Sequence, residues 1–370
     1  MTTAPSPQEP TSETLRRPRR RPRLQEGGLV LVILLIGLVL TLLAPTVRGE
    51  NGFLRFNNLI PSVFTTMSWI AIMSIGMTVV VIGGGIDISV GSIMGLAALG
   101  TAAVLQNYDP ATSAWIILPI GIGVALGIGL ICGLINGLLV VLLRMHPFIV
   151  TLGTLSIFRG ISLVSVREGS LPYGDRSLPD AFTDNFIAWT IHWQQAQPVP
   201  LLIMLAIMIL GWVYLRRMVW GRETYAVGGN EEAARFSGIN VGWVKIRSYI
   251  ISGLCAGAAG MVSCGFYKSA ATNTGLGYEL MVVAAAVVGG ASLNGGRGTA
   301  LGAVLGTLII QLIDNGISVL SQFKIGHWTF SVSKEYTQII IGVAIILAVA
   351  VDRLSEYIHT RRLARQHTRH

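Results

Sequence analysis

Charged residues are scarce in this chain of 370 residues. Asp, Glu, Lys and Arg together make up 12% of the sequence, whereas hydrophobic residues make up 52%. A soluble domain usually carries about 25% charged residues, and a disordered chain lacks the hydrophobic residues seen here. The composition therefore argues against both of these classes and indicates a membrane protein.

Cysteine is rare, and the common catalytic motifs are missing. The three cysteines, Cys132, Cys255 and Cys264, lie within apolar runs and have neither disulfide nor metal-ligand spacing. The sequence has no Gly-x-Ser-x-Gly elbow, no His-Glu-x-x-His pair and no Gly-Lys-Ser/Thr phosphate loop. We therefore expect no catalytic residue, no metal site and no cofactor bound by this chain.

Glycine, in contrast, is abundant. Its 44 occurrences follow no Gly-X-Y repeat, which excludes a collagen-like protein. Many are spaced four residues apart inside apolar runs, as at Gly129, Gly133 and Gly137, or at Gly253 and Gly257. Small residues at this spacing let helix backbones approach closely in a membrane. The pattern predicts tightly packed transmembrane helices.

Ten apolar segments reach, or nearly reach, the length of about 20 residues that a helix needs to cross a bilayer. They are 27–47, 64–82, 88–106, 115–143, 148–166, 199–215, 248–267, 279–291, 300–320 and 336–351. Segment 88–106 starts only a few residues after 64–82 ends and 279–291 is short, so eight or nine spans remain open. We predict an all-α polytopic membrane protein with about ten transmembrane helices.

The net charge of +9 comes largely from basic residues at the ends of these segments, which is a membrane pattern and not a nucleic-acid one. The Arg- and Pro-rich tail 1–26 is expected to be disordered, and the run 27–47 is too long for a signal peptide. Ten spans within 27–354 place most basic residues on one side. We therefore predict that both termini, including the basic tail 355–370, are cytoplasmic.

Two polar loops interrupt the apolar segments. The predicted outer loop, 167–198, contains several acidic residues, prolines and Trp193, and we expect it to fold against the outer surface. The predicted inner loop, 216–247, contains a short helix. Asn230 is a good N-cap residue, and Gly238 can take the left-handed conformation that ends a helix.

This short helix has two interpretations. It is either a capped loop helix without a partner or a rigid knob that docks on a cytoplasmic protein. Acidic residues in its first turn suit the positive end of the helix dipole, and Ala233, Phe236 and Ile239 can present a small apolar surface. The docking residues would be Asn230, Glu231, Glu232, Ala233, Ala234, Arg235, Phe236 and Gly238.

Two glycine-rich stretches, 83–91 and 289–298, are expected to break the surrounding helices. Each glycine weakens a helix by about 1 kcal/mol relative to alanine. Irregular backbone at membrane depth is tolerated only where protein or water satisfies it. In the first stretch we expect Asp87 to cap the next helix, with Ser89 in its first turn, and a ligand or proton site is the alternative.

Polar residues inside apolar spans are costly and usually face a cavity or a partner. Candidates for a translocation pathway are Asp87, Ser89, Asn136, Thr151, Thr154, Asp314 and Asn315. Simple hydrogen bonding to a neighbouring helix is the alternative for Asp314, and Arg159 is expected to snorkel outward. We expect interfacial belts, in preference to a sugar-stacking site, from Trp69, Phe266, Tyr267, Tyr278 and Trp328.

Several blocks, in order, resemble the permease subunits of ribose-type sugar ABC importers, whose branch also serves xylose, arabinose and galactose. The resemblance extends over 64–354, and its strongest blocks are 84–92, 133–137, 147–154, 225–241 and 289–298. Glu232 to Gly238 has the form Glu-Ala-Ala-x-x-x-Gly. This form resembles the loop by which ATP-driven importers engage their motor subunit.

The resemblance implies an all-helical permease of the vitamin-B12-importer type that works as a homodimer in a bacterial inner membrane. It implies two partners, a cytoplasmic ATPase that binds ATP and Mg²⁺ and a periplasmic sugar-binding protein. A monosaccharide would be the cargo. A nucleoside or furanone cargo, an ion-coupled secondary transporter and a non-transport membrane scaffold remain alternatives.

Overall fold

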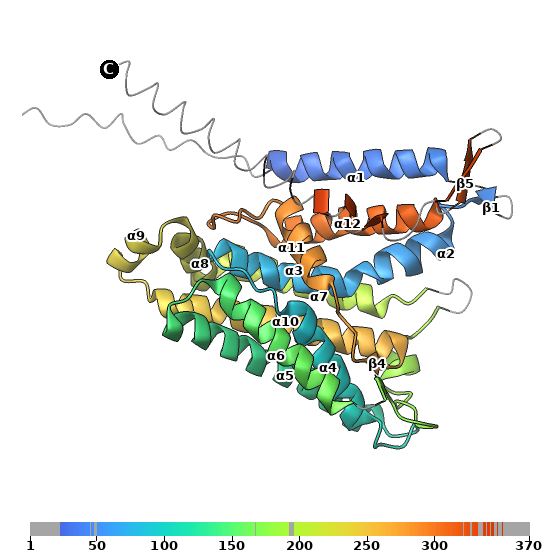
Figure 1. Ribbon diagram of the computed structural model, residues 1–370, viewed down its shortest axis with the longest axis horizontal. Helices are drawn as coiled ribbons and strands as arrows, with labels where there is room; N and C mark the ends of the chain where they lie inside the picture. The colour runs from blue at the N-terminus through green and yellow to red at the C-terminus, as the bar shows by residue number, and fades with distance from the viewer. Residues whose placement is uncertain are drawn as a thin grey trace, which may run out of the picture.

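The computed structural model of the chain describes a helical bundle (Figure 1). The described residues are 23–350, apart from 45, 48–49, 167, 192–195, 321, 326–327, 332–335, 338, 341, 344–345 and 347–349. The predicted tail 355–370 and most of the predicted tail 1–26 lie outside them. The first helix begins at Arg23, four residues before the predicted start of the span.

The bundle is formed by long helices joined by short ones. The long helices are α1 (Arg23–Leu43), α3 (Met67–Ile82), α4 (Val90–Leu105), α5 (Ala114–Leu143), α6 (Pro147–Ser165), α7 (Val199–Arg217), α10 (Val241–Tyr267), α11 (Tyr278–Val288) and α12 (Ala300–Val319). The short helical segments are α2 (Phe56–Asn58), η1 (Leu59–Thr65), η2 (Thr183–Ile187), α8 (Val219–Gly229) and α9 (Glu231–Phe236).

Strands are confined, in the described part of the chain, to three small antiparallel pairs. They are β1 (Thr46–Val47) with β2 (Glu50–Asn51), β3 (Ser170–Leu171) with β4 (Ala270–Ala271), and β5 (Gln322–Ile325) with β6 (Trp328–Ser331). All three pairs lie outside the long helices. The predicted all-α class is therefore confirmed.

Each of the first nine predicted segments contains a helix. Among the described residues, seven helical stretches are long and apolar enough to cross a membrane, and α4 and α11 are shorter. These two are short because a glycine break precedes α4 and another follows α11. The tenth predicted segment, 336–351, falls largely outside the described residues.

The centre of the bundle is α3. Every residue of α3 is buried, and its sequence is apolar or weakly polar all round, as expected for a helix enclosed by others. The long helix α10 packs against α3, α4 and α5. At one edge of the bundle α1 lies along α12, and α5 and α6 lie toward the opposite edge (Figure 1).

The glycines at four-residue spacing do bring two helices together. A Cβ atom added at Gly129 or Gly133 of α5 would overlap the backbone carbonyl of Gly253 or Tyr249, both on α10. A Cβ atom at Gly253 would likewise overlap the carbonyl of Gly129. The predicted close packing is therefore confirmed for this pair, because no larger residue fits between the two backbones.

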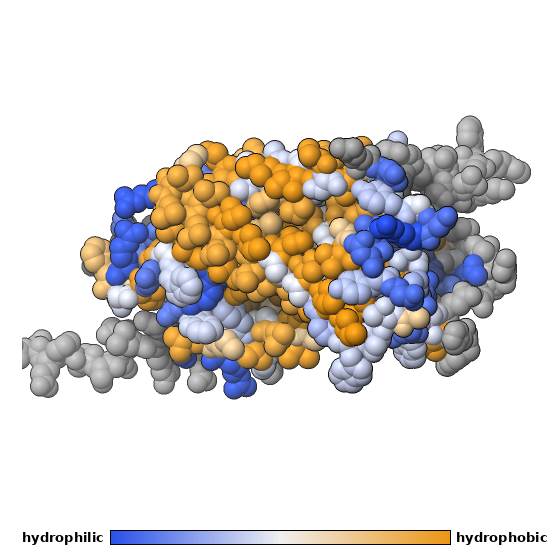
Figure 2. All heavy atoms as spheres, turned by 90° about the horizontal axis from the view of Figure 1, so that it is seen from below, coloured by the Kyte–Doolittle hydropathy of each residue, from blue (hydrophilic) through white to orange (hydrophobic). Residues whose placement is uncertain are grey.

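The surface is unusually apolar. Hydrophobic side chains cover the middle of the face in Figure 2, and hydrophilic ones gather toward the two ends. Trp115, Ile131 and Leu142 of α5 are among the exposed large hydrophobic residues. A continuous apolar surface of this extent marks contact with lipid or a partner, which agrees with a chain that crosses a membrane.

Candidate functional site

The helix predicted in the inner loop is α9. The side-chain oxygen of Asn230 accepts a hydrogen bond of 2.9 Å from the backbone N–H of Ala233, so Asn230 is its N-cap. Gly238 has a φ of 82°, in the left-handed region, and follows Ser237, the C-cap residue of the helix. Both predictions about the ends of the helix are confirmed.

Glu231 forms one ion pair within α9 and one that joins α9 to α10. The Glu231 carboxylate accepts hydrogen bonds of 3.1 Å from Arg235, one turn further along α9, and of 2.7 Å from Lys245 on α10. The pair with Lys245 adds to the packing of Ala234 against Val244 in holding α9 beside the start of α10. The Asn240 side chain caps α10 in turn, accepting a hydrogen bond from the N–H of Trp243 at 3.0 Å.

The two faces of α9 differ in character. Ala234 packs inward with Val227 and Val244, and Ile239 contacts the same cluster. Ile239 therefore faces the bundle, and the expectation that it belongs to an outward apolar surface is wrong. Phe236 is 91% exposed on the other face. The result is a single large aromatic side chain displayed on a firmly held helix.

The segment before α9 meets both glycine breaks. Gly228 of α8 packs so closely against α3 that a Cβ atom there would overlap the Ile82 carbonyl oxygen. The same oxygen accepts a hydrogen bond of 2.8 Å from the N–H of Gly296, and the Tyr225 hydroxyl donates one of 2.7 Å to the Gly298 carbonyl. Burial raises the pKa of Tyr225, so the hydroxyl keeps the proton that it donates. We call this meeting point the glycine junction.

Within the first break, the Asp87 carboxylate is fully buried and collects four hydrogen bonds. One oxygen accepts from the Ser89 N–H at 3.1 Å, the Ser89 hydroxyl at 2.6 Å and the Asn136 amide at 3.3 Å. The other accepts from the Ser252 hydroxyl at 2.8 Å. The N-cap of α4 is Ser89 and not Asp87, so Asp87 organises the loop before the helix instead of capping it.

Thr151 belongs to the same region. Its hydroxyl lies 3.0 Å from the Pro147 carbonyl of its own helix and 3.5 Å from the Ile86 carbonyl in the break. Thr154 is buried one turn later and donates to the Thr151 carbonyl at 3.3 Å. Five of the predicted pathway residues thus gather in and around a closed polar cluster, where their hydrogen bonds satisfy irregular backbone. Their role in a pathway stays a prediction.

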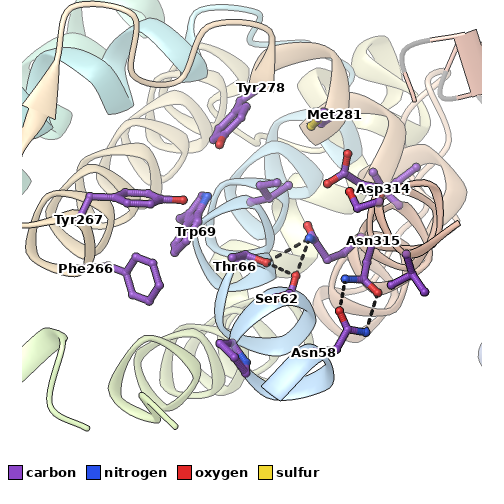
Figure 3. Close-up of a pocket in the computed structure, with 16 residues that line it drawn as sticks. Asn58, Ser62, Thr66, Trp69, Phe266, Tyr267, Tyr278, Met281, Asp314 and Asn315 are labelled. Carbon is purple, nitrogen blue, oxygen red and sulfur yellow. Dashed lines mark hydrogen bonds between the residues drawn. The ribbon is translucent and has the colours of Figure 1, made fainter. Parts of the chain in front are cut away.

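The other two predicted pathway residues, Asp314 and Asn315, line a separate cavity of about 640 Å³ (Figure 3). Asn315 exchanges hydrogen bonds of 3.0 and 2.9 Å with Asn58. Gln311 donates to the Ser62 carbonyl at 3.1 Å and to the Thr66 hydroxyl at 3.0 Å. These contacts close the α12 side of the cavity against α2 and η1.

Aromatic residues form the opposite side of this cavity. The centroid of the Trp69 ring lies 5.4 Å from that of Phe266 and 5.7 Å from that of Tyr267. Tyr278 also lines the cavity. Trp69 is only 2% exposed, so the prediction that it belongs to an interfacial belt is wrong. The sequence singled out these aromatic residues but did not show that they meet, because α3, α10 and α11 contribute them from distant parts of the chain. Trp328 belongs to β6.

Arg159 also points inward. Its guanidinium donates hydrogen bonds of 3.0 Å to the Thr272 carbonyl and 2.8 Å to the Thr274 carbonyl. The expectation of outward snorkelling is therefore wrong. Instead, Arg159 ties α6 to the turn between β4 and α11, because two backbone carbonyls there need a donor and no helix supplies one.

The predicted outer loop folds back onto the bundle. Phe182 is fully buried in the main core, and β3 pairs with β4 beside the end of α10. Lys268, the residue after α10, donates a hydrogen bond of 2.6 Å to Asp184. The expectation that this loop covers the bundle is confirmed for its described residues, which exclude Trp193.

Comparisons with known proteins agree on one family. Residues 59–349 match the family described as branched-chain amino acid transport system / permease component. The chain is 36% identical to the D-allose transport system permease protein of Escherichia coli K12, over 82% of this chain and 85% of that protein. It is 39% identical to the ribose import permease protein of Bacillus subtilis 168, over 76% and 80%.

A third relative covers still more of the chain. The galactose/methyl galactoside import permease protein of Escherichia coli K12 is 34% identical, over 90% of this chain and 95% of that protein. No solved structure matches the chain.

Proposed function

The chain belongs to the branched-chain amino acid transport system / permease component family, and from this premise we propose that it is the permease subunit of an ATP-driven monosaccharide importer. The observation that carries the proposal is the cargo of its relatives. The permeases described above serve allose, ribose and galactose, and each matches at least three quarters of this chain. The cargo proposed is a neutral monosaccharide of that class.

We place this subunit in a bacterial inner membrane with several spans, because its relatives are import permeases and its surface is apolar around the middle. The end that carries α9 faces the cytoplasm. Arg144, Arg235 and Lys245 gather at this end, where positive charge favours the cytoplasmic side. Both termini are then cytoplasmic, and the aromatic cavity opens in the outer half of the membrane.

The partners follow from the importer class. A cytoplasmic ATPase binds ATP and Mg²⁺ and supplies the energy, a periplasmic sugar-binding protein delivers the cargo, and a second copy of this chain completes the pathway in a permease of the vitamin-B12-importer type. No catalytic step is assigned to this chain, since its relatives are transport permeases.

The docking element for the ATPase is α9. Its fixed orientation and the exposed Phe236 ring suit insertion into a groove of a partner. The glycine junction then connects α9 through α8 to both glycine breaks, so that a push on α9 reaches α3, α4, α11 and α12 together. Movement around these breaks then exposes the translocation pathway to alternate sides of the membrane.

Uptake by living cells tests the cargo and the energy source. Deletion of the gene should abolish uptake of one labelled sugar among D-ribose, D-allose and D-galactose, and a plasmid copy should restore it. Uptake should persist with an uncoupler while cellular ATP is maintained. Uptake that collapses with the uncoupler, yet survives loss of the ATPase, would instead establish an ion-coupled transporter.

A double substitution tests the docking element. Glu232→Lys with Gly238→Trp reverses a charge on α9 and places a bulky side chain at its end. We expect sugar-dependent ATP hydrolysis by the assembled importer to fall at least tenfold. Unchanged hydrolysis by a complex that still assembles would show that α9 is not the coupling element.

A further inference from the structure

The cavity of about 640 Å³ has two chemically different walls (Figure 3). Its volume lies within the range of about 300–1,000 Å³ that is typical of small-molecule sites. One wall is aromatic and comes from α3, α10 and α11. The other is polar and comes from η1 and α12. Such a pairing of an apolar face with a few polar groups is characteristic of a ligand site rather than of packing between helices.

The aromatic wall presents a ring that is both accessible and fixed. The ring centroids of Phe266 and Tyr267 lie 5.0 Å apart, with an interplanar angle of 89°. Both rings also contact the buried ring of Trp69. Tyr267 itself is 54% exposed. A ring held by two neighbours loses little conformational freedom when a ligand stacks on it, so it can contribute more of its contact energy to binding.

The polar wall leaves one strong acceptor open. The amides of Asn315 and Gln311 are already occupied by Asn58, Ser62 and Thr66. The Asp314 carboxylate, in contrast, accepts no hydrogen bond from any residue in the part of the chain that the structure describes. In Figure 3 it points toward the space below Tyr278 and Met281. Ionisable side chains within membrane spans usually face a cavity or a partner and mark functional sites, and this carboxylate faces the cavity.

A neutral monosaccharide satisfies both walls. Its ring has an apolar face of C–H groups that can lie against an aromatic ring, and its edge carries neighbouring hydroxyl groups. Two such hydroxyls can donate to one carboxylate, and hydrogen bonds of this charge-assisted kind are the strong ones. A fatty chain would leave Asp314 unpaired, and an anionic ligand would be repelled by it.

We propose that this cavity is a sugar-binding station within the permease itself, with Tyr267 as the stacking ring and Asp314 as the hydroxyl acceptor. The proposal rests on the proposed function, because the ligand class is that of the importer's cargo. It goes beyond that function in assigning selectivity to the membrane subunit as well as to a secreted binding protein. Trp69 is then a positioning residue that holds the stacking ring.

Direct binding to the purified full-length permease in lipid nanodiscs tests the station, without the ATPase or the binding protein. The probes are radiolabelled D-ribose, D-allose and D-galactose, each at millimolar concentrations, with putrescine as a cationic competitor. The variants are Tyr267→Leu and Asp314→Ala, and Asp314→Asn retains one acceptor oxygen without the charge. Trp115→Leu and Asp175→Ala are matched controls, because Trp115 is 90% exposed on α5 and Asp175 is an exposed acid of the outer loop.

We expect saturable binding of one sugar that weakens at least tenfold in Asp314→Ala and in Tyr267→Leu, less in Asp314→Asn, and not in either control. Ser318→Trp serves as a second probe, which separates loss of binding from loss of folding. Ser318 is exposed at the rim of the cavity, so the indole should block the cavity and abolish binding while the melting temperature stays unchanged.

Three results would contradict the proposal of a sugar-binding station in this cavity. One is the absence of saturable binding, and another is binding that none of the cavity variants alters. The third is displacement by putrescine with complete loss in Asp314→Asn, which would identify a cation site. Uptake of the same sugar by wild-type cells is measured in parallel. If the cells take up the sugar but the purified permease does not bind it in the cavity, the sugar-binding station is refuted and the proposed importer function still stands.

Discussion

The Tyr225 hydroxyl donates a hydrogen bond of 2.7 Å to the carbonyl oxygen of Gly298 and so joins α8 to the loop that precedes α12. The two residues lie in different predicted loops. Their contact is one part of the glycine junction, where α8 also touches the end of α3. Four predictions test this junction, the buried polar cluster, the exposed ring of α9 and the helix packing.

The junction should not tolerate a methyl group at Gly228. A Cβ atom there overlaps the Ile82 carbonyl, so Gly228→Ala should push α8 away from α3 and lower the free energy of unfolding by about 1–3 kcal/mol. Gly229→Ala is the matched control, because nothing lies within 4 Å of a Cβ atom at that position. Thermal unfolding of the purified permease measures the stability, and sugar-stimulated ATP hydrolysis by the complex measures the coupling. Equal behaviour of the two variants would contradict the junction.

Loss of the buried carboxylate should be more costly than loss of one donor to it. Asp87→Ala leaves the Ser89 and Ser252 donors without their acceptor, while the Asn136 amide keeps its hydrogen bond of 2.7 Å to the Ser89 hydroxyl. Ser252→Ala, in contrast, removes a single hydrogen bond. A buried donor left without a partner costs about 1–3 kcal/mol, so we expect Asp87→Ala, which leaves several donors unpaired, to destabilise by more than that and Ser252→Ala by no more. The melting temperatures of the purified variants in detergent measure these losses of stability. Asp175→Ala, at an exposed position, is the reference, and its melting temperature should change little. The reverse order of the two shifts would refute the argument.

The exposed ring of α9 should matter for partner binding and not for stability. Buried aromatic anchors at interfaces contribute at least about 2 kcal/mol, which corresponds to roughly thirtyfold in affinity. Phe236→Ala should therefore weaken the affinity of the ATPase for the permease by that order. The melting temperature of the permease should stay constant, because the Phe236 side chain is 91% exposed. Trp115→Ala, equally exposed but on α5, should change neither quantity. Unaltered affinity in Phe236→Ala would remove α9 as the docking element.

Packing of α5 against α10 should depend on which glycine is replaced. Gly129→Val places a branched side chain against the Gly253 carbonyl, whereas Gly127→Val enters open space one half-turn away. We expect the first change to lower stability by about 1–3 kcal/mol or to prevent assembly of the bundle, and the second to have little effect. Thermal unfolding of both variants in the same detergent compares them. Similar melting temperatures would mean that this helix pair is looser than the structure indicates.

Much of the local structure follows from neighbouring residues alone. Asn230 and Gly238 mark the ends of a helix because a side-chain acceptor and a left-handed glycine satisfy the end groups locally. The two glycine breaks were also predictable, since consecutive glycines cannot sustain a helix. Ile239 and Arg159 were not, because the direction of a side chain depends on which element packs against it.

The candidate site shows the same division. Asp314 and Asn315 drew attention in the sequence because polar groups are costly inside an apolar span. The aromatic residues across the cavity were also noted, but they were assigned to interfacial belts, since an aromatic residue near the end of a span is equally suited to a membrane interface. Only the position of α3 beside the end of α10 brings Trp69, Phe266 and Tyr267 together.

Sequence by itself determined that this protein is a bundle of membrane helices with breaks at its glycine runs, because length, hydropathy and helix propensity act over a few turns of chain. Tertiary structure decided which of those breaks touch α8, and which polar and aromatic side chains share a cavity. These are contacts between residues far apart in the chain, and they depend on how closely helix backbones can approach, which no local pattern of side chains specifies.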